Sequence, residues 1–395
     1  MNAKGKITKE KIALITSAVT LIITLVLVFV SYAMRNRESQ FEASYEDSVN
    51  SVPESQEVSV LESSLSVSEV FNEISDTVSD ESVTEIPHGW VINELGYTYV
   101  YGDCGYEQFN YKSTALNRYA NALNNVANAL PEKTRLFNIT VPVSSTFASI
   151  PREIYTKDNF YNQAQSAFVS TVYSKTQERV IGVPIVSKLE EEYDNGEYVF
   201  FRTDKNWTQI GAYYAYAAYC ESADIIPFAL HNFPQKEVGD FLGSFYNATA
   251  SKEMADNPDK LVCCSTIPSV KTALTIYDKG IVYTDYALCE NKVDYKNAYN
   301  VFLGRNAARY ELSTTATGGS LLIIGDSSAY PMLPFLAAHY SKIELINPTL
   351  IDTTLNEYLS NRQFDDCIVM CYSTSAISGD FVPELNLLCG VNSDE

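Results

Sequence analysis

The sequence has few histidines and few basic residues. It contains three histidines, and its 28 Lys and Arg stand against 49 Asp and Glu, which gives a formal net charge of -21. A surface with this charge repels phosphate backbones, so DNA and RNA are excluded as partners. The sequence also has no His-Glu-x-x-His, no Gly-x-x-x-x-Gly-Lys and no Gly-x-Gly-x-x-Gly after a strand. It therefore predicts no metal site and no nucleotide cofactor.

Cysteine is present without a recognisable pattern. Of the eight cysteines, only Cys263 and Cys264 are adjacent, and none forms a Cys-x-x-Cys pair. This spacing indicates neither a disulfide framework nor a zinc site. We expect most of the thiols to be small buried side chains, and one or two disulfides remain open if the protein lies outside the cytoplasm.

The amino-terminal region predicts a membrane anchor. Residues 12–34 are uncharged and largely apolar, long enough for a helix that crosses the hydrocarbon layer. Four lysines in residues 1–11 place this short tail in the cytoplasm and the rest of the chain outside it, as a single-pass protein of the cell membrane. The alternative is a cleaved signal peptide ending at Ser31-Tyr32-Ala33, but the apolar run is longer than an ordinary signal core.

Residues 35–87 have the composition of a disordered linker. They are rich in serine, aspartate and glutamate and contain only scattered apolar residues, too few to offset the entropy of ordering the chain. Like charges keep such a chain extended. We expect an acidic tether that holds the next domain away from the membrane, and a binding role for this acidic run stays open.

Residues 88–395 predict one extracytoplasmic α/β domain, because β-rich and amphipathic stretches alternate along the chain and 46% of all residues are hydrophobic. The fold class that follows is a layered sheet with flanking helices. The expected strands are 97–101, 135–143, 197–202, 321–324 and 367–372, and the expected helices are 113–130, 164–174, 208–221 and 330–339.

The first candidate motif is Gly325-Asp326-Ser327-Ser328, between an expected buried strand and an expected helix. Ligands favour this edge of an α/β sheet, and backbone amides at a helix start can stabilise an oxyanion. Ser327 is therefore a candidate nucleophile. Serine and aspartate are also common helix caps, and this alternative stays open.

The second motif is Thr203-Asp204-Lys205-Asn206-Trp207-Thr208, which by itself indicates only a helix cap. Together, the two motifs resemble the DHHW-motif family of bacterial envelope proteins, which are relatives of the alginate O-acetylation proteins in the SGNH hydrolase and acyltransferase group. The resemblance extends over most of residues 97–390. It includes the runs 200–220, 241–246, 299–304 and 321–348.

The resemblance implies an SGNH-like fold in which Ser327 is the nucleophile and Asp204 orients a histidine base. In this sequence the base position is Asn206, and the other histidine of the DHHW turn is replaced by Lys205. A serine hydroxyl needs a proton acceptor to react near neutral pH, and an asparagine amide does not supply one. We therefore expect impaired catalysis.

Four further residues are expected to help bind a ligand: Gly325, Asp326, Trp207 and Asn306. Arg305 is expected near the same pocket. Among the histidines, we expect His339 to be structural, while His88 and His231 have little to recommend them as bases. Lys205 could replace the base only if burial kept it neutral.

The sequence thus predicts a membrane-anchored, SGNH-like envelope protein that acts on or binds acylated surface polysaccharide. If it is active, it is a serine-dependent O-acyltransferase or esterase. The alternative is a noncatalytic glycan-binding or assembly component of a surface-polysaccharide system. Its expected partners are the membrane, an envelope glycan and acyl-transfer proteins.

Overall fold

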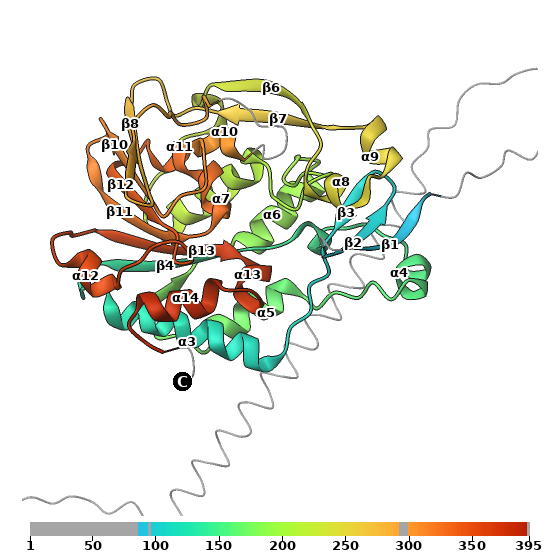
Figure 1. Cartoon of the computed structure of the whole chain (residues 1–395), viewed down its shortest axis with the longest axis horizontal. Helices are drawn as coiled ribbons and strands as arrows, with labels where there is room; N and C mark the ends of the chain where they lie inside the picture. Colours follow the sequence, from blue (N-terminus) through green and yellow to red (C-terminus); the bar gives the residue numbers. More distant parts are fainter. Residues whose placement is uncertain (1–85, 94–95, 292–298, 393–395) are drawn as a thin grey trace, which may run out of the picture. The chain divides into compact units, whose positions relative to one another are not determined.

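The computed structural model describes residues 86–93, 96–291 and 299–392 (Figure 1). The predicted cytoplasmic tail 1–11, the predicted transmembrane helix 12–34 and nearly all of the predicted linker 35–87 lie outside the described residues. Within the described ranges, no helix combines the length and apolar character needed to span a bilayer. Residues 84–395 form one compact unit with its own hydrophobic cores, so this part is expected to fold independently.

An eight-stranded mixed sheet lies at the centre of the fold, in the order β5-β4-β13-β11-β12-β10-β8-β9. The first five strands in this order run parallel to one another, whereas β10 pairs antiparallel with β12 and with β8, and β9 pairs antiparallel with β8. The strands are β4 (Arg135–Val141), β5 (Val180–Gly182), β8 (Thr272–Asp278), β9 (Ile281–Tyr283), β10 (Arg309–Thr314), β11 (Gly318–Gly325), β12 (Tyr340–Ile346) and β13 (Asp366–Tyr372).

The two central strands are apolar because both of their faces are covered. Every residue of β13 is buried, and so are the last five residues of β11. Ile323 of β11 pairs with Ile368 of β13 and with Leu345 of β12, which forms one buried row across the sheet. Strands buried on both faces are expected to be continuously apolar. The predicted strands 321–324 and 367–372 are confirmed.

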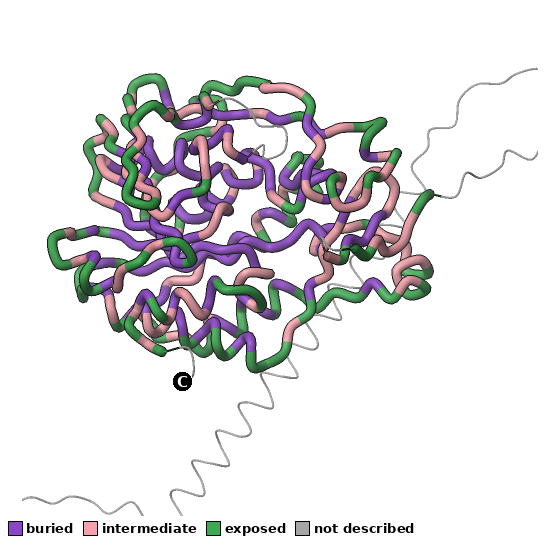
Figure 2. Tube along the Cα trace, viewed as in Figure 1, coloured by how far each residue is buried: buried purple, intermediate pink, exposed green. Residues whose placement is uncertain are grey.

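Helices cover both faces of the sheet, and each layer has its own core (Figures 1 and 2). One layer consists of α3 (Ser113–Ala129), α5 (Gln165–Tyr173), α13 (Ser373–Ile377) and α14 (Phe381–Leu388). The other consists of α6 (Ile185–Asp194), α7 (Gln209–Ser222), α10 (Asn300–Leu303) and α11 (Leu333–Leu336). The predicted helix 113–130 is confirmed as α3, whose buried side chains recur at helical spacing, and Pro131 follows its end.

Smaller elements surround this sandwich. An antiparallel sheet consists of β1 (His88–Asn93), β2 (Gly96–Tyr101) and β3 (Cys104–Tyr106), and an antiparallel ribbon consists of β6 (Gln235–Phe241) and β7 (Asp259–Cys264). The short helices are η1 (Ser144–Thr146), α4 (Arg152–Lys157), η2 (Leu230–Asn232), α8 (Ser244–Thr249), α9 (Lys252–Asp256), η3 (Ser327–Met332) and α12 (Leu355–Leu359).

Three expected elements differ from the structure. Residues 97–101 form a strand, but it belongs to the small sheet and not to the central one. Residues 197–202 contain only an isolated bridge from Phe200 to Trp207. The expected helix 330–339 is replaced by the 3₁₀ helix η3 and the short α11, because Pro331 and Pro334 lack the N–H groups that a longer α-helix requires.

All eight cysteines lie among the described residues and are free thiols. Six of them are buried, which confirms that most serve as small core side chains. Burial raises the pKa of Cys263 and Cys264 to about 12, so these thiols remain protonated at neutral pH.

Candidate active site

Ser327 lies on the turn where β11 ends and η3 begins. Asp326 caps η3, because its Oδ1 accepts a hydrogen bond from the backbone N–H of Ser328 at 2.9 Å. Its Oδ2 accepts from the Ser375 hydroxyl at 2.9 Å and from the Tyr372 N–H at 3.2 Å. Both oxygens of the Asp326 carboxylate are therefore engaged in hydrogen bonds that hold the turn. Ser327 is half-buried, and no group among the described residues accepts a hydrogen bond from its hydroxyl.

Asp204 holds a second turn in the same way. Its Oδ1 accepts from the N–H of Asn206 at 2.8 Å, and its Oδ2 accepts from the N–H of Ser244 at 2.7 Å. The neighbouring Gly243 is required, because a Cβ at that position would lie 2.2 Å from the Cβ of Asp204. Both carboxylate oxygens are thus engaged by backbone amides, and the side chain is 8% exposed.

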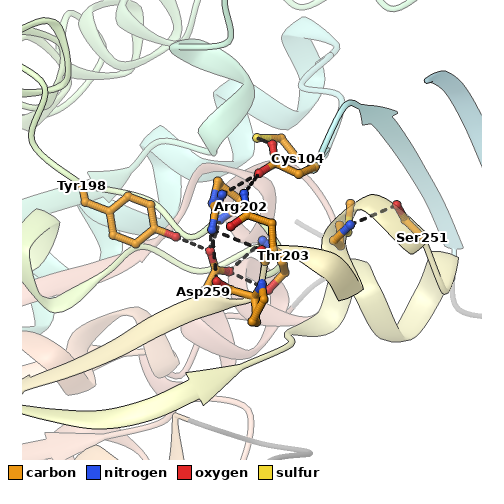
Figure 3. Close-up of polar contacts among 10 residues, drawn as sticks. Cys104, Tyr198, Arg202, Thr203, Ser251 and Asp259 are labelled. Atoms are coloured by element: carbon orange, nitrogen blue, oxygen red, sulfur yellow. Dashed lines mark hydrogen bonds and ion pairs between the residues drawn. The ribbon is translucent and has the colours of Figure 1, made fainter. Parts of the chain in front are cut away.

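A buried carboxylate, Asp259, positions this second turn from below (Figure 3). Its Oδ2 accepts from the N–H of Thr203 at 2.8 Å and from the Thr203 hydroxyl at 2.6 Å. Its Oδ1 accepts from Arg202, whose Nε lies 3.3 Å away, and from the hydroxyl of Tyr198. Asp259 is fully buried, and the sequence analysis missed it because it lies more than fifty residues from the turn in no recognisable motif.

Trp207 joins the two turns. Its indole N–H donates to the carbonyl of Ser328 at 3.1 Å, and its own carbonyl accepts from the hydroxyl of Tyr299. Trp207 is fully buried. Trp207, Gly325 and Asp326 therefore lie beside the site and shape it, but they do not line the cavity described next.

Between the two turns lies a cavity of about 260 Å³. The sequence-predicted residues Ser327, Asp204, Asn206 and Asn306 all line it. The remaining lining residues are Lys205, Phe241, Leu242, Gly243, Ser244, Asn247, Tyr299, Asn300 and Tyr330. The structure thus brings together residues that are more than one hundred positions apart in the chain, as the resemblance implied.

Asn306 is held by a tyrosine that also lines the cavity. The hydroxyl of Tyr330 donates to Asn306 Oδ1 at 2.7 Å. Burial raises the pKa of Tyr330 well above its ordinary value, so this hydroxyl stays protonated. Because the amide oxygen is already occupied, the Nδ2 donors of Asn306 remain for a ligand.

The cavity contains no proton acceptor suited to a serine nucleophile. None of the three histidines, all of which are described, lines it. His339 Nε2 is paired with the hydroxyl of Tyr216 at 2.6 Å, and burial lowers the pKa of His339, which agrees with a structural role. His88 is paired with Asp158 at 2.6 Å, and His231 lies on η2.

The side chains at the two former histidine positions do not fill this role. Lys205 is exposed, so the burial that a neutral lysine base requires is absent. Asn206 Oδ1 is buried without a hydrogen-bond partner among the described residues. A buried acceptor without a donor is costly, and a bound ligand can satisfy it. Within the part of the chain that the structure describes, the site offers a free serine hydroxyl and amide donors but no imidazole.

Comparison with known proteins gives a family match and several similar folds. The sequence model of the family described as DHHW protein matches residues 38–346. No curated protein matches the chain. A solved DHHW family protein from Eubacterium siraeum DSM 15702 is similar, with 21% identity, a TM-score of 0.67, and coverage of 77% of this chain and 98% of that one.

Two structures of Bacillus cereus PatB1 are also similar in fold. One, with a sulfonyl adduct, has 15% identity and a TM-score of 0.54 and covers 75% of this chain and 97% of that one. The other has 16% identity and a TM-score of 0.54, with 75% and 99% coverage. At these identities the likeness concerns the fold: a large mixed sheet with helices on both faces.

Proposed function

The chain belongs to the DHHW protein family. From this premise, we propose that it is an SGNH-like protein of the cell envelope that binds acylated surface polysaccharide in the Ser327 cavity. We also propose that it has lost efficient acyl transfer. The coarser assignment, to a family related to polysaccharide acylation, is supported by the family match. Residues 12–34 would anchor the protein in the membrane, and the acidic residues 35–87 would hold the domain in the envelope.

One observation carries the loss of catalysis: the position at which the resemblance expects the base is Asn206, and no histidine among the described residues lines the cavity. The Asp204 carboxylate lines it, but both of its oxygens accept from backbone amides. Asp204, which would orient an imidazole, still occupies its place beside this position. Ser327 and Asp204 thus line one cavity without the imidazole that would accept the serine proton. General-base catalysis contributes on the order of 10² to 10⁴ in rate, so its loss leaves a slow enzyme or none.

What remains is suited to recognition. The Ser327 hydroxyl, the Nδ2 group of Asn306 and the Lys205 ammonium can all donate to the carbonyl oxygen of an O-acyl group. The partly apolar walls, including Phe241 and Leu242, can contact the acyl carbon chain. A small cavity with a few convergent donors is typical of a specific binding site.

The test is the reaction of residues 84–395 with an activated aryl ester, followed by phenol release and by intact mass. We expect negligible turnover and no stable adduct in the natural sequence. In Asn206→His, the introduced imidazole accepts the Ser327 hydroxyl proton as Oγ attacks the acyl carbon, and the phenolate leaves. This variant should react at least roughly 100-fold faster and acquire one acyl group.

The control is the double variant Asn206→His with Ser327→Ala, which should lose both the rate and the adduct. If the natural sequence already forms an acyl adduct on Ser327, the protein is an active acyltransferase or esterase with another base, and the proposed loss of catalysis is wrong. If Ser327→Ala changes neither the rate nor the adduct, both in the natural sequence and in Asn206→His, Ser327 is not the nucleophile.

A further inference from the structure

The small β1-β2-β3 sheet exposes large apolar side chains at one end. In the β1-β2 hairpin, Trp90 pairs with Tyr99 and Ile92 pairs with Tyr97, so all four lie on the same face. Tyr99 is fully buried, but Ile92 is 63% exposed and Tyr97 is 70% exposed. Paired apolar side chains with this exposure indicate a contact surface.

Trp90 is held in a fixed orientation at the inner end of this face. Its indole N–H donates to the carbonyl of Asp158 at 2.8 Å. Its ring packs edge-on against Tyr99, with centroids 5.4 Å apart, and against Phe160, with centroids 5.5 Å apart. An aromatic ring fixed in this way loses little entropy when a ligand stacks on it.

Trp90, Ile92 and Tyr97 line a groove of about 500 Å³. The other residues that line it form its polar wall: Glu107, Gln108, Thr374 and Ser378. The polar wall offers a carboxylate, an amide and two hydroxyls. Among the described residues, no lysine or arginine lines this groove, and the whole chain carries a net charge of -21.

The groove adjoins the Ser327 cavity through two links. Thr374 lies on α13, where the next residue, Ser375, donates to Asp326 Oδ2 at 2.9 Å. On the other side, the backbone N–H of Gly105, two residues before Glu107, donates to the carbonyl of Arg202 at 2.8 Å, two residues before Asp204. Both links join a segment that carries groove residues to a segment that holds the cavity.

We propose that this groove binds an uncharged stretch of a glycan chain and so positions the polymer whose acyl group enters the Ser327 cavity. The sugar's C–H faces would stack on Trp90 and Tyr97, and its hydroxyls would pair with the polar wall. The negative surface and the absence of a cation disfavour polyuronates. The inference takes its ligand class from the proposed function, but it concerns a different set of residues.

The test is calorimetric titration of residues 84–395 with unacylated oligosaccharides. The probes are neutral glucan, mannan and N-acetylglucosamine oligomers, with a polygalacturonate oligomer for comparison. We expect at least one neutral probe to bind and the uronate to bind much more weakly. Tyr97→Ala should raise Kd roughly tenfold, since one stacked ring is lost. The matched pair is Ile92→Ala, in the groove, and Ile226→Ala, an 89% exposed residue outside it, which should not change Kd.

The outcomes separate the two proposals. The binding of unacylated probes is measured apart from the ester assay, so either proposal can fail while the other holds. The groove proposal is overturned if no neutral probe binds at millimolar concentration, if the uronate binds as tightly as the best neutral probe, or if Tyr97→Ala and Ile92→Ala bind as the natural sequence does. It is also overturned if these variants instead abolish self-association or peptide binding.

Discussion

The two turns that meet at the cavity are built alike but present different chemistry to it. In each turn an aspartate accepts from the N–H two residues later: Asp326 from Ser328 at 2.9 Å, and Asp204 from Asn206 at 2.8 Å. In each turn, the second carboxylate oxygen accepts from a distant segment. The first turn presents the hydroxyl of Ser327 to the cavity, whereas the second presents the amide of Asn206.

The difference shows that architecture and reactivity are separable in this site. Asp204 keeps its place because it holds the turn and not because it serves a base. The same holds for Trp207, whose indole N–H joins the turns. Both turns therefore keep their hydrogen bonds with an amide at position 206.

The largest effect should come from removing the support beneath the second turn. Asp259→Ala leaves Arg202 and the Thr203 amide without their buried acceptor, and breaking a buried charged network costs about 3–5 kcal/mol. Denaturant unfolding should show this loss. Asp240→Ala, which removes an exposed partner of Lys260, is the control and should change stability little. An equally small loss in Asp259→Ala would mean that the turn holds itself.

The next effect tests how tightly the two turns are packed. In Gly243→Ala the new Cβ meets Asp204 at 2.2 Å, while in Gly325→Ala it meets the Met370 carbonyl at 2.8 Å. We expect Gly243→Ala to cost about 2–3 kcal/mol and Gly325→Ala less. The free energies of unfolding give the order, and the reverse order would show that the Ser327 turn is the more rigid.

Isosteric replacements compare the two aspartates directly. In Asp204→Asn the new NH2 group must face a backbone N–H, since both oxygens accept from amides, and we expect a cost of about 2 kcal/mol. In Asp326→Asn the new NH2 group also faces a backbone N–H, that of Tyr372, but at the longer distance of 3.2 Å. The Ser375 hydroxyl can rotate and accept from this NH2 group, so we expect about 1 kcal/mol. Urea unfolding of the two variants measures the difference. A larger cost at Asp326 would contradict the view that Asp204 is the more constrained.

The smallest expected effect on stability concerns Glu344, a carboxylate that is paired with cationic side chains and not with backbone amides. Burial of Glu344 opposes its ionisation, but Lys342, Tyr358 and Arg309 outweigh this and hold its pKa below the ordinary 4.5. A depressed folded pKa stabilises the protein above pH 4.5, and this stabilisation is lost as the pH falls through the folded pKa. One such group changes stability by at most about 1.4 kcal/mol per pH unit.

Unfolding between pH 7 and about pH 3 tests this expectation. Glu344→Gln should flatten the decline below pH 4.5, while Glu311→Gln, a more exposed partner of Arg309, should keep it. An unchanged slope in Glu344→Gln would mean that other carboxylates control acid unfolding.

The sequence predicted the elements whose signal is local. The apolar run of β11 and the helical spacing of α3 were sufficient for their assignment. Part of the cavity lining also followed, because the resemblance joined Asp204 and Asn206 to Ser327 and Asn306, whereas three further expected residues lie beside the cavity: Gly325, Asp326 and Trp207. The antiparallel half of the sheet was not predicted, since strand order depends on packing between distant segments.

Other features depend on contacts that leave no trace in the sequence. Asp259 is an isolated aspartate at the start of β7, and only its burial beneath Thr203 reveals its role. Tyr97 was correctly placed in a strand, but its exposure depends on that strand belonging to the small sheet. The proposed groove therefore required the fold.

The hydrogen bond from the Trp207 indole is accepted by a main-chain group, the Ser328 carbonyl. It therefore does not depend on the side chains at positions 206 and 327. Proteins that keep this hydrogen bond could exchange those two side chains in evolution and still fold. Active and inactive relatives could then differ by a single codon, and restoring activity would require no change elsewhere in the fold.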